Sequence, residues 1–226
     1  AVTGNSGAIE VGTGASTATA ARDSLGLMSI KDSLWETPST LWTWSNGSMR
    51  VMQRFAQGSN VLASGSYAHA SGVSTSATGP FSNAQNRQTS ATAICSSAEG
   101  EGTTASGTAS HAEGMLSQAS ALAAHAEGYN TDAVANYGHS EGYATLSGGT
   151  AAHAEGYQTD AQGLYSHSEG RQTESGGTAS HSEGQSTLAS GDLSHAEGFE
   201  TTASGYASHS GGYGTLASGL YSRALG

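Results

Sequence analysis

The sequence has 226 residues, among them 33 glycines, 2 prolines and 3 phenylalanines, and the small residues Ala, Ser, Thr and Gly dominate it. Such residues bury little apolar surface each, which excludes an ordinary globular core for a single chain. The net charge is −11, and 14 of the 18 acids lie in residues 69–226 beside three arginines, which argues against binding to nucleic acid or to anionic membranes.

Residues 1–28 form the first predicted segment. Ser16 or Thr17 can cap a short helix over Ala18–Leu25, and Gly26 can end it. The stretch GTGASTATAARDSLGL over residues 12–27 resembles a motif common in tail fibres of tailed phages. The residues that match are Gly12, Thr13, Gly14, Ala15, Ser16, Thr17, Ala18, Ala21, Arg22, Leu25, Gly26 and Leu27. The N-terminal residues also lack the basic start and apolar run of a signal peptide, as expected for a virion protein assembled in the cytoplasm.

Residues 29–64 gather most of the bulky side chains. These are Trp35, Trp42, Trp44, Met49, Val51, Met52 and Phe55. Asn46-Gly47 between two short apolar runs predicts a tight hairpin turn. We interpret this segment as a small packed cap over the first coil of a solenoid. An aromatic patch that binds carbohydrate is the alternative.

Residues 65–226 repeat with a period of 14. All nine histidines fall in one register, which we call position 0. Position +2 is Glu in eight consecutive units, position +3 is Gly in eleven of twelve with Asn86 as the exception, and position +6 is Thr in ten of eleven. Positions +8 and +13 hold small residues, and position +10 is Gly or Ala. The sequence ends within a repeat, so we expect further repeats or a distal tip to follow.

The two glycine positions lie seven residues apart and divide each unit into two strands and two turns. Glycine supplies the positive φ that tight turns need. The expected turn glycines at position +3 are Gly114, Gly128, Gly142, Gly156, Gly170, Gly184, Gly198 and Gly212. Each unit is then one coil of a parallel β-solenoid, with successive coils about 4.8 Å apart.

Side chains alternate between the two faces of a strand, so the small residues at positions +13, +1, +6 and +8 are expected to point into the interior of a flat coil. Histidine, glutamate and position +12, which holds Phe81, Tyr137, Tyr165, Leu193 and Tyr221 among alanines, are expected to point outward. Such a thin roll needs a second buried surface, which predicts self-association. The predicted interface residues are His111, Glu113, His125, Glu127, His139, Glu141, His153, Glu155, His167, Glu169, His181, Glu183, His195 and Glu197.

The repeat resembles the 14-residue head repeat of trimeric autotransporter adhesins, S-V-A-I-G-x-x-S-x-A-x-G. The small and glycine positions match over residues 65–226, but histidine and glutamate stand where that family has Val and Ile. The resemblance implies an all-β fold, a left-handed parallel β-roll, with three rolls packed around a threefold axis. It also implies that His and Glu line the interface between the three chains.

Catalysis is not expected. The recurring H-[AS]-E lacks the P-C-x-x-C of zinc deaminases, and no G-x-S-x-G elbow accompanies the serines. Adjacent Ser and His also point to opposite faces of a strand. A fibre depolymerase, a more remote possibility, would need a carboxylate pair in a groove, whereas each Glu of the repeat belongs to one column.

The histidines and glutamates allow two interpretations. We favour a hydrogen-bonded His–Glu network that satisfies both groups and lowers the pKa of the glutamates, without a metal ion or cofactor. The alternative is an ion held by symmetry-related histidines, because imidazole suits Zn, Ni or Fe.

The sequence therefore predicts a structural and adhesive shaft of a phage tail fibre, located in the virion and acting outside the cell. Its expected partners are two further copies of the chain, tail or baseplate proteins on the N-terminal side, and a glycan or protein receptor on the host surface. We expect no nucleic-acid partner and no membrane insertion. The head of a bacterial trimeric surface adhesin is the alternative, and the two differ in how they are anchored.

Overall fold

The computed structural model describes residues 42–45, 48–51 and 54–226. The predicted tail-fibre motif and its short helix in residues 1–28 lie outside the described residues, as does most of the predicted cap. Within the described part of the chain every regular element is a strand, and it contains no helix that could span a membrane.

Strands β1 (Trp42–Ser45) and β2 (Ser48–Val51) form an antiparallel pair in which Ser45 lies opposite Ser48. This register leaves two residues, Asn46-Gly47, to connect the strands, as the sequence predicts.

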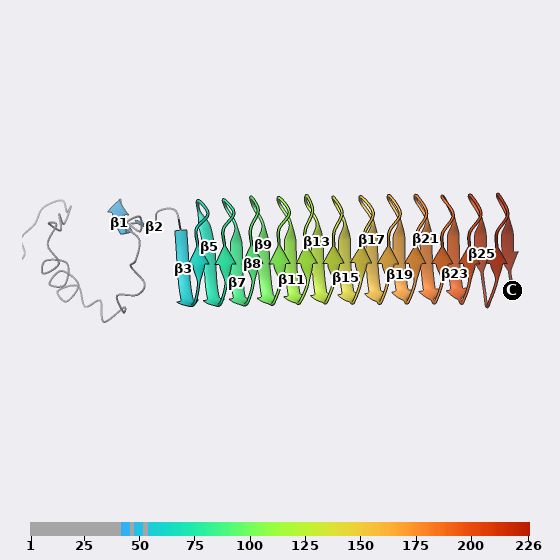
Figure 1. Ribbon diagram of the computed structural model, residues 1–226, viewed down its shortest axis with the longest axis horizontal. Coiled ribbons are helices and arrows are strands. Elements are labelled where there is room, and N and C mark those ends of the chain that lie inside the picture. The colour runs from blue at the N-terminus through green and yellow to red at the C-terminus, as the bar shows by residue number, and fades with distance from the viewer. Residues whose placement is uncertain (1–41, 46–47, 52–53) are drawn as a thin grey trace, which may run out of the picture. The chain divides into compact units, whose positions relative to one another are not determined.

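A parallel β-solenoid occupies residues 54–226 (Figure 1). It begins at Arg54, within the segment 29–64 that was predicted to form the cap. Each coil contributes one long and one short strand, and the two kinds form separate sheets of 13 and 12 strands. The long strands are β3 (Arg54–Ser59), β5 (Ala68–Val73), β7 (Asn83–Arg87), β9 (Ser97–Glu101), β11 (His111–Met115), β13 (His125–Tyr129), β15 (His139–Tyr143), β17 (His153–Tyr157), β19 (His167–Arg171), β21 (His181–Gln185), β23 (His195–Phe199), β25 (His209–Gly211) and β27 (Arg223–Leu225). The short strands are β4 (Leu62–Ala63), β6 (Ser76–Ala77), β8 (Ser90–Ala91), β10 (Thr104–Ala105), β12 (Gln118–Ala119), β14 (Asp132–Ala133), β16 (Leu146–Ser147), β18 (Asp160–Ala161), β20 (Glu174–Ser175), β22 (Leu188–Ala189), β24 (Thr202–Ala203) and β26 (Leu216–Ala217).

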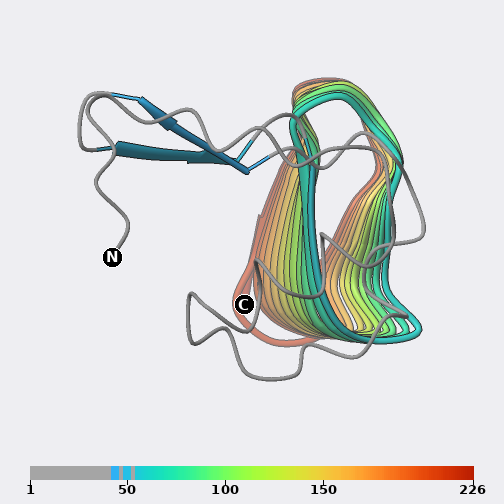
Figure 2. The same cartoon turned by 90° about the vertical axis from the view of Figure 1, so that its left-hand side faces the viewer.

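The register between coils follows the sequence repeat without a slip. Each long strand pairs with the strand 14 residues further on, so that His153 lies beside His167 and Glu155 beside Glu169. Viewed along the solenoid, the coils superimpose on one another (Figure 2). Identical positions therefore form straight columns along the solenoid.

The interior contains only small side chains, as the sequence predicts. In the described solenoid every fully buried apolar residue is an alanine, for example Ala154 at position +1 and Ala161 at position +8. Buried Thr and Ser at positions +6 and +13 complete the core. Because such side chains bury little apolar area, the backbone hydrogen bonds between coils carry much of the cohesion.

The first turn of each coil lies two residues later than predicted. The second turn does contain the predicted glycine at position +10, since Ser166 N donates to Gly163 O at 3.2 Å. The glycines at position +3 have positive φ, 115° at Gly156, and Asn86 has φ 83°, yet most of them lie inside a long strand and not in a turn. The chain bends at positions +5 and +12, where residues such as Gln158 (φ 54°) and Tyr165 (φ 58°) adopt the left-handed conformation. Hydrogen bonds from Gln158 N to Tyr143 O (2.8 Å) and from Tyr165 N to Thr150 O (2.9 Å) tie these bends to the previous coil. Because the second half of each coil lies between the bends at positions +5 and +12, its strand is only two residues long.

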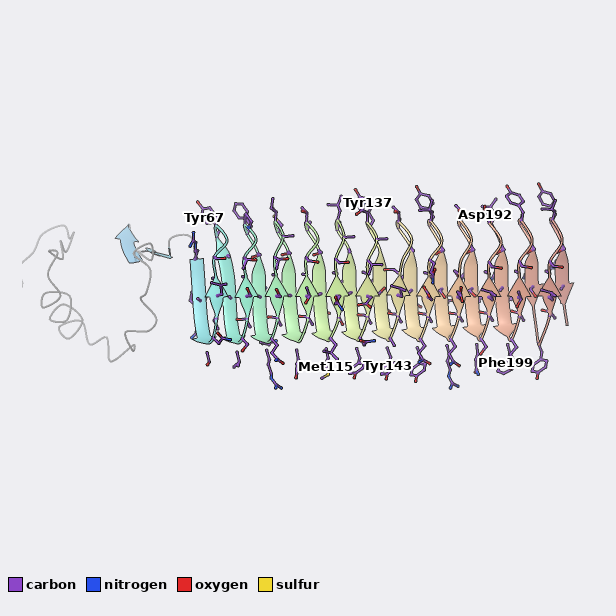
Figure 3. The ribbon with its side chains drawn as sticks, in the orientation of Figure 1. Tyr67, Met115, Tyr137, Tyr143, Asp192 and Phe199 are labelled. Carbon is purple, nitrogen blue, oxygen red and sulfur yellow. The ribbon has the colours of Figure 1, made fainter. Side chains whose placement is uncertain are left out.

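Position +12 does not share a face with histidine and glutamate, which corrects the sequence interpretation. Tyr67 and Tyr137 project from one edge of the coils, while Met115, Tyr143 and Phe199 at position +4 project from the opposite edge (Figure 3). The reason is the left-handed φ at +12, 60° at Tyr137, which interrupts the extended alternation before the long strand begins.

Candidate functional site

The candidate site is the outer face of the long-strand sheet, where histidine and glutamate form two parallel columns. Histidine opens each long strand from β11 to β25, with a buried Ala or Ser after it. Glutamate stands two residues after the histidine from β11 to β23, whereas Gly211 occupies this position in β25. Alternation places both polar side chains on the same face. We call this surface the His–Glu face. It contains all fourteen predicted interface residues together with Glu99 and His209.

The imidazole rings of this face stack into a continuous column of eight, from His111 to His209. Neighbouring ring centroids lie 4.7–5.1 Å apart and the ring planes differ by 1–15°. The ninth histidine, His69, stands apart and packs edge-on against Phe55 at 4.8 Å. The column thus follows from the in-register pairing of one residue type.

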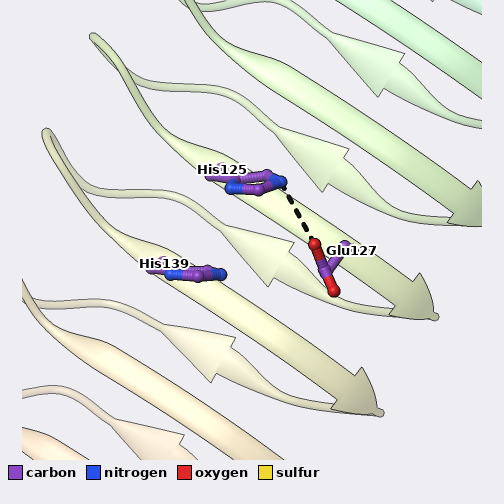
Figure 4. Close-up of side chains that lie close together, drawn as sticks. All are labelled: His125, Glu127 and His139. Atoms are coloured by element: carbon purple, nitrogen blue, oxygen red, sulfur yellow. Dashed lines mark ion pairs between the residues drawn. The ribbon is translucent and has the colours of Figure 1, made fainter.

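The histidines change their glutamate partner along the column. In the five coils from His111 to His167, Nε2 lies 3.5–3.8 Å from a carboxylate oxygen of the glutamate in the same coil, as Figure 4 shows for His125 and Glu127. His195 and His209 instead approach Glu183 and Glu197 of the preceding coil, at 3.6 and 3.1 Å. These side chains remain 32–44% exposed in the single chain.

The expected hydrogen-bonded network is present only in part. Among the described histidines, His209 alone hydrogen-bonds to a glutamate, Glu197. The Nε2 atoms of the other seven stacked histidines are shielded from solvent and have no hydrogen-bond partner. In most His–Glu pairs the carboxylate therefore lies close to the imidazole ring without forming a hydrogen bond.

Protonation is disfavoured at three histidines of the column. Burial lowers the pKa of His125, His153 and His181, and the positive charges that the neighbouring histidines would carry lower it further, against the opposing effect of the glutamates. Neutral imidazole is thus the preferred form at these three positions at neutral pH.

Two glutamates of the column differ from each other. Burial raises the pKa of Glu169, and a hydrogen bond shared with Glu183 raises it further, whereas the same hydrogen bond lowers the pKa of Glu183. The expectation that the pKa of every glutamate would be lowered is therefore wrong for Glu169, because burial and the hydrogen bond with Glu183 outweigh the lowering effect of His167.

Position +4 forms a further column that was not predicted, although the same 14-residue period contains the signal. Tyr129, Tyr143 and Tyr157 stack with centroids 4.8–5.0 Å apart, and the guanidinium of Arg171 lies 5.9 Å from the Tyr157 ring centroid. This edge is exposed, so it offers an aromatic strip beside the His–Glu face. The side chains of the predicted tryptophan patch lie outside the described residues.

Five groups of three side chains on the His–Glu face bring potential metal ligands together. The ligand atoms of each group lie within 4.8 Å of one another, as for His125, Glu127 and His139 in Figure 4. Neutral imidazole and carboxylate can both coordinate a divalent ion.

No family model matches this chain, and no curated protein matches it either.

Proposed function

We propose that this chain forms part of the shaft of a phage tail fibre, a homotrimer that projects a host-binding tip and contributes to receptor binding. The observation that carries the proposal is the unbroken solenoid of residues 54–226, whose coils repeat without an inserted loop or domain. A stack of identical coils gives length and stiffness, which are the properties that a shaft needs.

The surface of the single chain supports the trimer. The interior offers only small side chains, while Tyr137, Tyr165 and Leu193 at one edge and Tyr143 and Tyr157 at the other are exposed. The partly exposed His–Glu face lies between these edges. Packing against two further copies would bury this apolar surface, which one chain alone leaves in water.

The assignment to a phage rests on the resemblance of residues 12–27 to the tail-fibre motif. In this proposal the N-terminal side docks onto tail or baseplate proteins, the fibre is part of the virion, and the receptor is a glycan or protein of the host surface. The shaft performs no catalysis.

The alternative is the head of a bacterial trimeric surface adhesin, which the 14-residue repeat itself favours. Antibodies raised against residues 54–226 distinguish the two functions. Immunogold electron microscopy should label fibres on purified phage particles from the source culture and leave intact, uninfected cells unlabelled. Label on the surface of intact cells, with none on particles, would reject the phage assignment in favour of the adhesin.

A further inference from the structure

We propose that the His–Glu face binds divalent transition-metal ions within a single chain, one ion for every two coils. The ligands are histidine and glutamate side chains of adjacent coils, and the chemical class is an ion that prefers imidazole, such as Zn²⁺, Co²⁺ or Ni²⁺. The site does not depend on the number of chains in the assembly, because each group of ligands comes from one chain.

The first argument is distance. A tetrahedral ion with bonds of about 2.05 Å holds its ligand atoms about 3.3–3.4 Å apart. His125 Nε2 and Glu127 Oε2 are 3.5 Å apart, and the same distance recurs at His139–Glu141 and His153–Glu155. This spacing is long for a hydrogen bond and close to the spacing of two ligands on one ion.

The second argument is the state of the imidazole nitrogens. Nε2 of His125, His139 and His153 is shielded from solvent and has no hydrogen-bond partner. A buried polar atom without a partner is costly, and a metal ion would satisfy it through its lone pair. The next ring lies 4.7–4.8 Å away, so small rotations of half-exposed side chains bring a second imidazole to the same ion.

The third argument is charge. The glutamates of adjacent coils are in register, so the column of carboxylates repels itself along its length. One divalent ion neutralises the glutamates of two coils. An ion in every coil would place dipositive charges only about 4.8 Å apart, which is strongly unfavourable.

Neighbouring ligand groups share residues, which also limits binding to one ion for every two coils. Of the five ligand groups, three have no residue in common: His125, Glu127 and His139; His153, Glu155 and His167; and Glu183, His195 and Glu197. The expected stoichiometry is therefore three ions per chain.

The test uses the full chain without a polyhistidine tag, freed of metal by chelation. Calorimetric titration with Zn²⁺ and visible absorption with Co²⁺ should both saturate at three ions per chain. An excess of Mg²⁺ should not compete, because that ion prefers oxygen ligands. Absence of saturable binding of either ion would overturn the proposal.

The triple variant His139→Gln, His153→Gln, His167→Gln removes a ligand from four of the five groups and leaves only Glu183, His195 and Glu197. Its stoichiometry should fall from three to one. His69→Gln is the matched control, because Ser71 and not glutamate stands two residues after this histidine, and it should still bind three. Three ions on the triple variant, or a loss in the control, would contradict the assignment.

A measurement on the unaltered chain covers the case in which the triple variant fails to fold. Diethyl pyrocarbonate modifies accessible imidazoles, and saturating Zn²⁺ should slow the modification of the stacked histidines while that of His69 is unchanged. Equal modification with and without Zn²⁺ would overturn the proposal.

Discussion

At the scale of single residues, the buried threonines at position +6 differ in the hydrogen bonding of their hydroxyl groups. Thr201 donates to the carbonyl oxygen of Glu197 at 3.0 Å, whereas the hydroxyl of the equally buried Thr159 has no partner. Thr201→Val should lower the free energy of unfolding by about 1 kcal/mol, because it removes a hydrogen-bonded hydroxyl. Thr159→Val should be neutral or stabilising, because a methyl group of the same shape replaces a hydroxyl that has no partner. Urea unfolding of both variants measures the difference, and equal losses would contradict it.

Asp132, at position +7 on the short-strand sheet, provides a pH-dependent test. Burial raises the pKa of its carboxyl group. The protonated acid is therefore favoured by folding, and its contribution to stability is present below the unfolded pKa of about 3.9 and lost as the pH rises through the folded value. At pH 7 the charged carboxylate destabilises the fold.

Asp132→Asn should accordingly raise the melting temperature at pH 7, by the equivalent of less than about 1 kcal/mol because the group is half-exposed. At pH 3 the variant and the parent chain should melt together. Glu174→Gln, an exposed acid at the same position of a later coil, is the control and should leave both melting temperatures unchanged. An increase of the same size at pH 3 would show that charge is not the cause.

At the scale of the coil, a comparison of Gly156 with Gln158 shows which of the two positions requires glycine. Gly156 has φ 115°, and a Cβ atom there would meet the carbonyl oxygen of Gly170 at 2.2 Å. Gln158 is also left-handed, at φ 54°, but Ala144 occupies the equivalent position with φ 53°. The close approach of the next coil, and not the turn itself, is what requires glycine.

Gly156→Ala should destabilise the solenoid by about 1–3 kcal/mol or more, because strained backbone and a backbone contact both oppose the methyl group. Gln158→Ala should change stability by less than about 0.5 kcal/mol. Thermal unfolding followed by circular dichroism compares them. Similar melting temperatures would mean that the coils can separate locally at no cost.

At the scale of the whole solenoid, the proposed trimer predicts a mass. Sedimentation equilibrium should give three times the 22.5 kDa of one chain and should hold on dilution through the micromolar range. The physical reason is that the single solenoid has an interior of small residues and exposes its Tyr and Leu side chains at both edges. A stable monomer with the circular dichroism of a β-solenoid would reject the trimer.

The sequence by itself determined the period of 14, the inward positions and the column of histidines. It could do so because parallel in-register pairing repeats each residue type on itself, so that Ala154 must stack on Ser168 and His153 on His167. The hairpin of β1 and β2 was predictable for a similar reason, since Asn-Gly specifies a two-residue turn locally.

Only the tertiary structure decided where the coil bends and which glutamate each histidine approaches. The bends at Gln158 and Tyr165 lack the glycine that marks a left-handed residue in a sequence, and hydrogen bonds to the previous coil stabilise them instead. His153 approaches Glu155 of its own coil at 3.5 Å, but His195 approaches Glu183 of the preceding coil at 3.6 Å. Because the repeat offers both partners at similar distances, the choice depends on side-chain geometry between coils, which the spacing of residues along the chain does not encode.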